Sequence, residues 1–150
     1  MNDPYGEQFI KQMNQFQEGL VEHPECIPKL DTTTQKAALT YLLELACHTT
    51  HIRNITLGRQ AIWIIPNDWL INNIEIAAES LLKLNDDWDY RRLIELYWRI
   101  GIPLVHRLAL YGLDSENPEI KETAIECLGK IKQNGLQNIE GFPGFDYWEK

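Results

Sequence analysis

The sequence predicts an all-α protein, a short right-handed α-solenoid built from about three helix pairs. Two observations predict this fold class. Apolar residues recur at spacings of three and four along most of the chain, and no segment keeps the apolar–polar alternation of a half-buried strand. In addition, three of the expected helices open with an apolar residue followed by a basic one, each after a short polar turn. A recurring helix pair of this kind is the unit of a solenoid.

The first third of the chain predicts two helices joined by a connector, followed by a third helix. The first helix is expected within residues 7–21, with an apolar face formed by Phe9, Met13, Phe16 and Leu20. Residues 22–33 hold two prolines, which favour a connector between helices. The next helix covers residues 34–48, capped by Asp31 or a following threonine, and the third covers residues 50–65.

The middle of the chain shows the same helical spacing of apolar residues. Asn67 or Asp68 is expected to cap a helix within residues 67–84, and a further helix covers residues 86–100. Pro103 suits the first turn of the helix that follows, because that turn does not need its backbone N–H.

The last predicted helix has clear start and stop signals. Asn117 is the expected cap, Pro118 takes the first helical position, and Gly135 ends the helix. The remaining segment, residues 135–150, holds three glycines and a proline and cannot form a long helix. Its aromatic side chains are expected to cover the last apolar edge of the stack; they are Phe142, Phe145, Tyr147 and Trp148.

The length of 150 residues suits a single domain over residues 1–150. Within it we expect three repeats and two capping segments. The repeats are residues 32–65, 67–101 and 102–134, and the capping segments are residues 1–31 and 135–150.

The last repeat carries the clearest family resemblance. The stretch LDSENPEIKETAIECLGKI, residues 113–131, resembles the HEAT-repeat family, whose second helix opens with an aliphatic and a basic residue, continues with small residues and ends near a Leu-Gly pair. The matching residues are Ile120, Lys121, Ala124, Cys127, Leu128 and Gly129. Tyr90-Arg91 and Ile52-Arg53 stand at the same place in the two earlier repeats, so that the resemblance covers roughly residues 34–132.

The HEAT resemblance implies roles for particular residues. The second helices of such a stack line its concave inner surface, and a ladder of basic residues bonds the turn carboxylates of neighbouring repeats. Arg91 stands at the ladder position, which implies a structural role for it. We therefore expect replacement of Arg91 to destabilise the fold more than replacement of Arg92.

The charge distribution limits the possible partners. The formal net charge is −8, and both ends of the chain are acidic, whereas residues 51–107 balance 7 basic against 7 acidic residues and hold every arginine. The negative net charge argues against binding to duplex nucleic acid or to an anionic membrane surface. Three cysteines without CxxC spacing, no N-terminal apolar segment and no run of 18 apolar residues predict a cytoplasmic protein with reduced thiols.

One cluster has the residue types of a metal site or a nucleophile. Glu44, Cys47, His48 and His51 lie close together in sequence, and His23, Cys26 or His106 would have to supply a further ligand. Thr49 and Thr50 interrupt the helical spacing, so a solvated turn beside a buried cysteine is the expected interpretation. A further alternative is that Cys47 acts as a nucleophile, paired with His48 or His51. No phosphate loop or hydrolase motif is present, and we expect no metal, no cofactor and no catalysis.

A stripe of charged residues is the predicted partner-binding surface. Arg92, Glu95 and Arg99 share one face of their helix at spacings of three and four. The resemblance places this face on the concave groove, where other second helices contribute Arg59, Glu122 and Glu126. A partner protein or an acidic peptide segment would fit such a groove. The alternative is a self-satisfied face on which Arg92, Glu95 and Arg99 pair with one another.

These observations predict a non-catalytic protein-interaction module, such as an adaptor, a scaffold or an inhibitor or immunity-type protein. The alternative is a HEAT-like enzyme or enzyme subunit that binds a small ligand in its groove, as the lyases of that fold do. A third possibility is an oligomer formed through the aromatic tail, and the sequence leaves the oligomeric state open.

Overall fold

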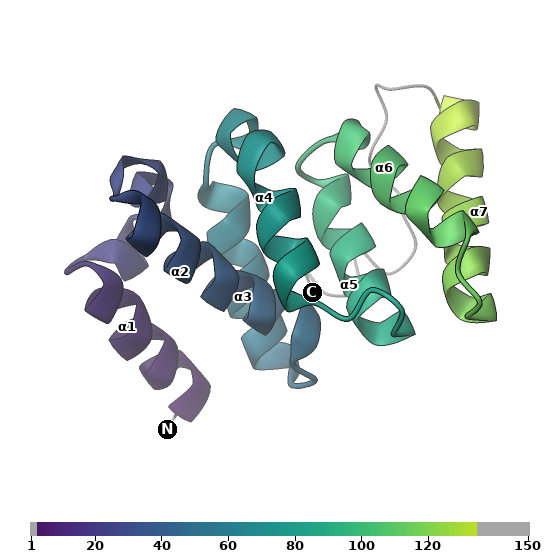
Figure 1. Cartoon of the computed structure of the whole chain (residues 1–150). Coiled ribbons are helices and arrows are strands. Elements are labelled where there is room, and N and C mark those ends of the chain that lie inside the picture. Colours follow the sequence, from purple (N-terminus) through teal and green to yellow (C-terminus); the bar gives the residue numbers. More distant parts are fainter. Residues whose placement is uncertain (1–2, 135–150) are drawn as a thin grey trace. The chain divides into compact units, whose positions relative to one another are not determined.

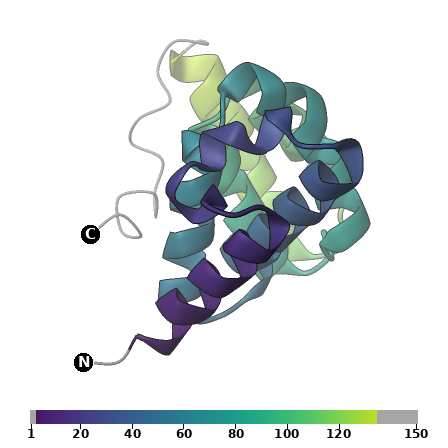
Figure 2. The same cartoon turned by 90° about the vertical axis from the view of Figure 1, so that its left-hand side faces the viewer.

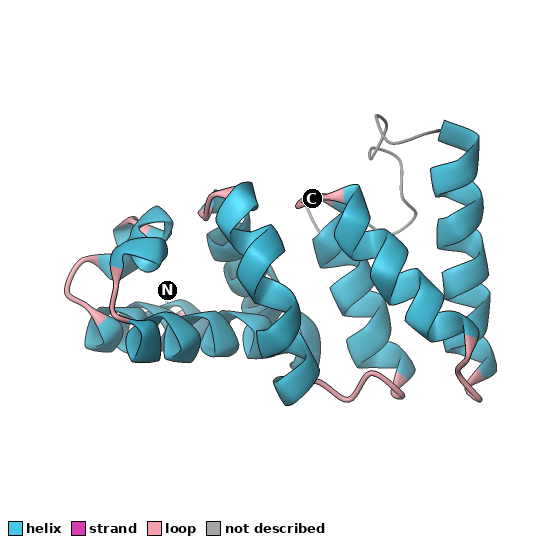
Figure 3. Ribbon diagram, turned by 45° about the horizontal axis from the view of Figure 1, so that its top comes forward, coloured by secondary structure: helices cyan, strands magenta, loops and turns pink. Residues whose placement is uncertain are grey.

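The computed structural model describes residues 3–134, and every regular element within that range is helical (Figure 3). The predicted all-α class is therefore confirmed. Gly135 and the aromatic tail at residues 135–150 lie outside the described residues, as does the capping role expected of the tail. The described chain divides into two compact units that meet between Leu81 and Leu82, inside the predicted second repeat.

The described part of unit 1 holds four α-helices, together with two short 3₁₀ helices and one π-helical turn (Figure 1). Helix α1 packs against α2 and α3, and α2 also contacts α4 (Figure 2). In chain order the elements are α1 (Pro4–Phe16), η1 (Leu20–Glu22), η2 (Pro24–Lys29), α2 (Thr32–Leu43), η3 (Glu44–His48), α3 (Ile52–Ile64) and α4 (Asn67–Leu81).

One sequence-based expectation about unit 1, the end of the first helix, is wrong. Helix α1 ends at Phe16 rather than near Gly19 or shortly after it, because Gln17 is extended and Gly19 adopts a left-handed backbone with φ of 84°. The predicted connector at residues 22–33 lies mainly between α1 and α2, and it contains the end of η1 and the whole of η2. Both are 3₁₀ helices, whose shorter hydrogen-bonded turns accommodate closely spaced prolines.

The helix expected over residues 34–48 changes its winding before it ends. It is α-helical as far as Leu43 and then forms the π-helical turn η3, in which the Thr49 N–H donates to the Glu44 carbonyl at 3.2 Å. One extra residue in the turn widens it. As a result Glu44 and His48 are exposed, whereas the residues between them are buried: Leu45, Ala46 and Cys47.

Helix α3 lies close to the end of α2 because position 58 is a glycine. A Cβ atom there would lie 2.7 Å from the Leu42 carbonyl oxygen and 2.8 Å from the Ala46 amide nitrogen. The close approach buries Ile55 and Ile62 of α3 completely. The glycine inside this helix therefore serves packing rather than a turn.

Unit 2 consists, within the described residues, of three helices that all contact one another. They are α5 (Asp87–Trp98), α6 (Ile102–Leu113) and α7 (Pro118–Asn134). Tyr90 of α5 is fully buried among them, and its hydroxyl donates to the Leu108 carbonyl at 2.9 Å. Burial also raises the pKa of Tyr90, so that it stays a neutral hydrogen-bond donor.

Polar side chains cap several helices, and two of these caps, Asp31 and Asn117, are at positions that the sequence predicts. The Asp31 carboxylate accepts from the Thr34 N–H at 2.9 Å, and the Asn117 side chain accepts from the Glu119 N–H at 2.9 Å. Asp86 caps α5 in the same way through the Trp88 N–H, at 2.8 Å. Each of these bonds satisfies a backbone donor that the first helical turn leaves without a partner.

Candidate functional site

The structure places half of the six predicted partner-binding residues in the interior. Arg59 in unit 1 is 1% exposed, and in unit 2 Arg92 and Glu95 are 6% and 1% exposed. Arg99 is partly exposed, and of the six residues only Glu122 and Glu126, both on α7, are classed as exposed. Three of these charges are therefore not available to a partner on an open face.

Arg92 and Glu95 form a buried ion pair on α5. Nη2 of Arg92 lies 2.9 Å from Oε2 of Glu95, and the guanidinium stacks over the Trp88 ring at 4.7 Å from its centroid. This geometry matches the self-paired alternative for these two residues. A buried pair is costly to break from one side, because the remaining charge stays away from water.

Arg91 is more exposed than Arg92, which is the opposite of what their expected roles imply. The Arg91 side chain is 44% exposed and its Nε lies 4.0 Å from Glu95, whereas the Arg92 side chain is 7% exposed. The buried face of α5 is wide, since every residue from Arg92 to Trp98 is buried. Arg92 therefore lies inside this face, and the carboxylate that Arg91 approaches belongs to its own helix rather than to a neighbouring turn.

In unit 1 the corresponding basic residue, Arg53, does reach a distant carboxylate. Its Nη2 lies 2.7 Å from Oδ2 of Asp3, and Asp3 also caps α1 through the Gly6 N–H. The hydrogen bond from Arg53, followed by that from the Gly6 N–H, holds the pKa of Asp3 below its ordinary value. This contact joins the start of α1 to the start of α3.

The residues considered for a metal or a nucleophile differ in their exposure to solvent. Cys47 is fully buried, while Glu44, His48 and His51 are exposed. His51 stacks on Tyr5 at 3.9 Å between ring centroids, and its Nδ1 accepts from the Arg53 N–H. In the part of the chain that the structure describes, no group of three or more His, Cys, Asp or Glu side chains is arranged to hold a metal ion.

Cys127 behaves as a core residue. It is fully buried in α7, and burial raises the pKa of its thiol to about 12. The thiolate that nucleophilic chemistry needs is therefore scarce at neutral pH.

A small groove lies between α2 and α4 in unit 1. Its volume is about 180 Å³, and we call it the α2/α4 groove. Ile76 is 72% exposed at this groove, the largest exposure among the bulky apolar side chains that the structure describes. The lining residues are Thr32, Gln35, Lys36 and Leu39 from α2 and Trp69, Asn73, Ile76 and Ala77 from α4.

The polar atoms of the α2/α4 groove are partly engaged already. Nε2 of Gln35 donates to the Pro28 carbonyl at 2.7 Å, and Nδ2 of Asn73 donates to the Trp69 carbonyl at 2.7 Å. Lys36 supplies the only charge among the described lining residues. The groove thus offers apolar surface with one cation at its border.

Sequence reasoning missed the α2/α4 groove, although α4 held a signal for it. Leu70, Ile74 and Ala78 form the buried stripe of this helix. Trp69 and Ile76 lie on a second stripe beside it, seven positions apart. Two large apolar side chains outside the core stripe of an amphipathic helix are a sign of a surface that another molecule covers.

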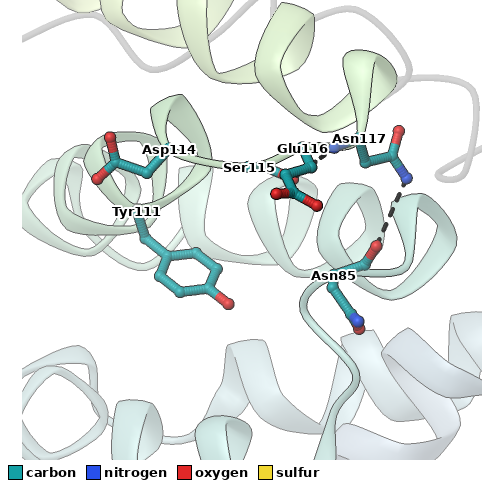
Figure 4. A pocket seen from close by; sticks show the side chains of 6 residues that line it. All are labelled: Asn85, Tyr111, Asp114, Ser115, Glu116 and Asn117. Carbon is teal, nitrogen blue, oxygen red and sulfur yellow. Dashed lines mark hydrogen bonds between the residues drawn. The ribbon is translucent and has the colours of Figure 1, made fainter.

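Unit 2 carries a larger and more polar hollow of about 670 Å³ (Figure 4). Tyr111, 54% exposed, comes from the last turn of α6, and Asn85 comes from the segment before α5. Nδ2 of Asn117 donates to the Asn85 carbonyl at 3.5 Å. The loop between α6 and α7 completes the lining with Asp114, Ser115, Glu116 and Asn117.

Comparison with known proteins gave no match: no protein-family model, no curated protein and no solved structure resembles this chain closely enough to be significant. Among the described residues, no helix combines the length and the apolar character needed to span a membrane.

Proposed function

We propose that the protein is a non-catalytic protein-interaction module that docks a partner protein on the α2/α4 groove. The exposure of Ile76 carries this proposal. Ile76 is 72% exposed, more than any other bulky apolar side chain that the structure describes, and the partly exposed Trp69 lines the same groove. Fully burying such a side chain contributes about 1.5–3 kcal/mol to an association, and tryptophans are frequent anchors of binding surfaces.

The HEAT-like solenoid remains part of this proposal. The contacts of α2 with α3 and of α6 with α7 support pairing within the first and third repeats. In that arrangement α2 and α4 are the first helices of their repeats, so the groove belongs to the layer opposite the concave one. The burial of Arg92 and Glu95 argues against a concave surface lined by exposed arginines.

An adaptor, scaffold or inhibitor role in the cytoplasm is consistent with the three free cysteines.

Capture of a partner from a native lysate tests this function. The baits are the wild type, Ile76→Lys and the matched control Ile125→Lys, which changes an isoleucine on α7 that is 57% exposed. Circular dichroism confirms that each bait is folded. Loss of a captured protein with Ile76→Lys alone supports the proposal. Equal capture by all three baits, or no specific capture by the wild type, contradicts it.

The hollow in unit 2 supports the second candidate, a HEAT-like enzyme or enzyme subunit with a small ligand. Its volume of about 670 Å³ lies within the range of small-molecule sites, although its lining is more polar than most of them. Native mass spectrometry of the purified protein tests this alternative. A co-purified small molecule that is lost from Tyr111→Ala would favour it, and a protein without added mass would count against it.

A further inference from the structure

We infer that the contact between the starts of α1 and α3 is a pH-sensitive latch, which weakens when the His51 ring takes up a proton in mildly acidic solution. Four residues form the latch: Asp3 and Tyr5 at the start of α1, and His51 and Arg53 at the start of α3. None of them lines the α2/α4 groove, so the inference does not rest on the proposed function.

Two side-chain contacts join the two helices in the latch. The ring of His51 stacks on the ring of Tyr5, with 3.9 Å between the centroids and 21° between the planes. Arg53 donates to both carboxylate oxygens of Asp3, from Nη2 to Oδ2 at 2.7 Å and from Nε to Oδ1 at 3.4 Å. Because Asp3 also caps α1 through the Gly6 N–H, the latch includes the first turns of both helices.

The His51 ring fills its place in the latch only while it is neutral. His51 is the N-cap of α3, and its Nδ1 accepts from the Arg53 N–H at 3.1 Å. This bond needs a lone pair on Nδ1, whereas both ring nitrogens of a protonated histidine carry a hydrogen. Protonation therefore turns Nδ1 into a donor that faces another donor, and the first turn of α3 loses its side-chain cap.

The charges around His51 determine the sign of the effect. A positive ring at the start of α3 is opposed by the helix dipole and by the positive charge of Arg53 in the same turn. Stacking on Tyr5 favours a positive ring, but a cation–π contact is weak at an exposed position. The lost cap and the helix dipole together outweigh it, so protonation weakens the latch.

No carboxylate compensates for the positive ring. The Asp3 carboxylate is already paired with Arg53, and among the described residues none forms an ion pair with His51. The titratable or charged groups on the elements next to His51 are Asp3, Tyr5 and Glu7 on α1, Arg53 on α3, and Glu44 and His48 on η3.

The latch responds in a pH window of its own. Histidine ordinarily changes its charge between pH 5 and 8. The hydrogen bonds from Arg53 and the Gly6 N–H hold the pKa of Asp3 below its ordinary value of 3.8, so Asp3 stays charged throughout that window. Since the open latch binds the proton more readily than the closed one, the closed form loses stability as the pH falls. Fraying of the first turn of α3 then moves Arg53, which weakens its bond to Asp3.

Hydrogen exchange of the full chain, detected by mass spectrometry at pH 7.5 and 5.5, tests the latch. The rates are corrected for the intrinsic effect of pH, so that protection factors are compared. In the wild type we expect the protection of amides in residues 7–11 and 55–58 to fall about three- to tenfold at pH 5.5. The amides of α7, in the other unit, are the internal reference and should keep their protection.

Replacement of single histidines identifies the group that responds. His51→Asn is the matched variant, because asparagine caps a helix well and has no ring to titrate, so its protection should be the same at both pH values. His51→Asp also keeps a cap and is the second variant, in case the first folds poorly. His106→Asn removes an exposed histidine on α6 and should respond to pH as the wild type does.

Three results would overturn the inference. The first is a wild type with equal protection of α1 and α3 at both pH values. The second is a fall of the same size in His51→Asn or His51→Asp, since another group would then be responsible. The third is higher protection of the wild type at pH 5.5, which would mean that stacking of the positive ring on Tyr5 is the stronger effect.

Discussion

Arg91 and Arg92 are adjacent in α5 but differ in their surroundings, and this difference predicts their energetic roles. Arg92→Ala leaves Glu95 buried without its ion-pair partner at 2.9 Å. Removing one member of such a pair lowers the free energy of unfolding by about 3–5 kcal/mol. Arg91→Ala removes a half-exposed contact at 4.0 Å and should cost less than about 1 kcal/mol.

Urea denaturation followed by circular dichroism measures both changes. Arg91→Ala is the matched control, because it removes the same side chain from the neighbouring position. An equal loss of stability in the two variants, or a greater loss for Arg91→Ala, would contradict the buried pair and restore the role that the HEAT resemblance implies for Arg91.

The contact between Asp3 and Arg53 predicts a pH dependence of stability. The hydrogen bond from Arg53 lowers the pKa of Asp3 from its ordinary value of 3.8, so the carboxylate stabilises the folded state at any pH above that value. This stabilisation is lost as the pH falls through the lowered pKa. Wild type should therefore melt at a higher temperature than Asp3→Ala at pH 7, and the difference should shrink below about pH 4.

Calorimetry at pH 7, 5, 4 and 3 follows the melting temperatures of wild type and Asp3→Ala. The same series on Arg53→Ala is informative, because this variant should show a similarly reduced dependence. A difference between wild type and Asp3→Ala that stays constant down to pH 3 would show that the charge of Asp3 does not act in the folded state.

At the scale of the element, two helical glycines predict opposite effects of the same substitution. At Gly58 a Cβ would lie 2.7 Å from a carbonyl oxygen of α2, so Gly58→Ala must push α3 away from its neighbour. Overpacking of this kind typically costs about 1–3 kcal/mol. At Gly129 of α7 no atom of the described residues, apart from its chain neighbours and the nearby backbone of its own helix, lies within 4 Å of the added Cβ, and alanine should stabilise the helix by about 0.5–1 kcal/mol.

Thermal unfolding of the two variants provides the comparison. Gly129→Ala is the control for the intrinsic gain of alanine in a helix, since it lacks the close contact. If Gly58→Ala raised the melting temperature as Gly129→Ala is expected to do, the close approach of α3 to α2 and η3 would be refuted.

At the scale of the whole molecule, the two units each contain a fully buried cysteine, Cys47 in unit 1 and Cys127 in unit 2. A buried thiol reacts with a thiol reagent only after its surroundings open, so the two labelling rates report on the stability of each unit. Gly58→Ala should accelerate the labelling of Cys47 more than that of Cys127. Mass spectrometry of peptides from labelled native protein measures both rates, and equal acceleration would mean that the chain opens as one cooperative unit.

The helices could be predicted from the sequence because their signals are local. Asp31 and Asn117 cap helices through bonds to backbone groups two or three residues away, and Pro118 begins α7. Such interactions depend on neighbours in the chain rather than on the fold. Boundaries were less predictable, as the early end of α1 and the 3₁₀ helices around Pro24 and Pro28 show, because several short helical forms compete with similar energies.

The burial of the predicted partner-binding stripe on α5 could not be predicted, because it depends on which segments pack together. A spacing of three and four places Arg92, Glu95 and Arg99 on one stripe, but it does not reveal whether that stripe faces solvent. Packing within α5 and its neighbours buries Arg92 and Glu95 and leaves Arg99 partly exposed. Periodicity identifies a face, and tertiary contacts decide its environment.

By itself the sequence determined the all-α class, the order of the helices and the caps at Asp31 and Asn117, because helix formation follows from local hydrogen bonding and apolar spacing. Only the tertiary structure decided that Arg92 is buried and Arg91 is not, and that α2 and α4 enclose a groove with Ile76 at its border. The physical reason is that both features require residues about 40 positions apart, or whole helix faces, to come together. That association depends on the burial of apolar surface over the entire unit, which no local pattern specifies.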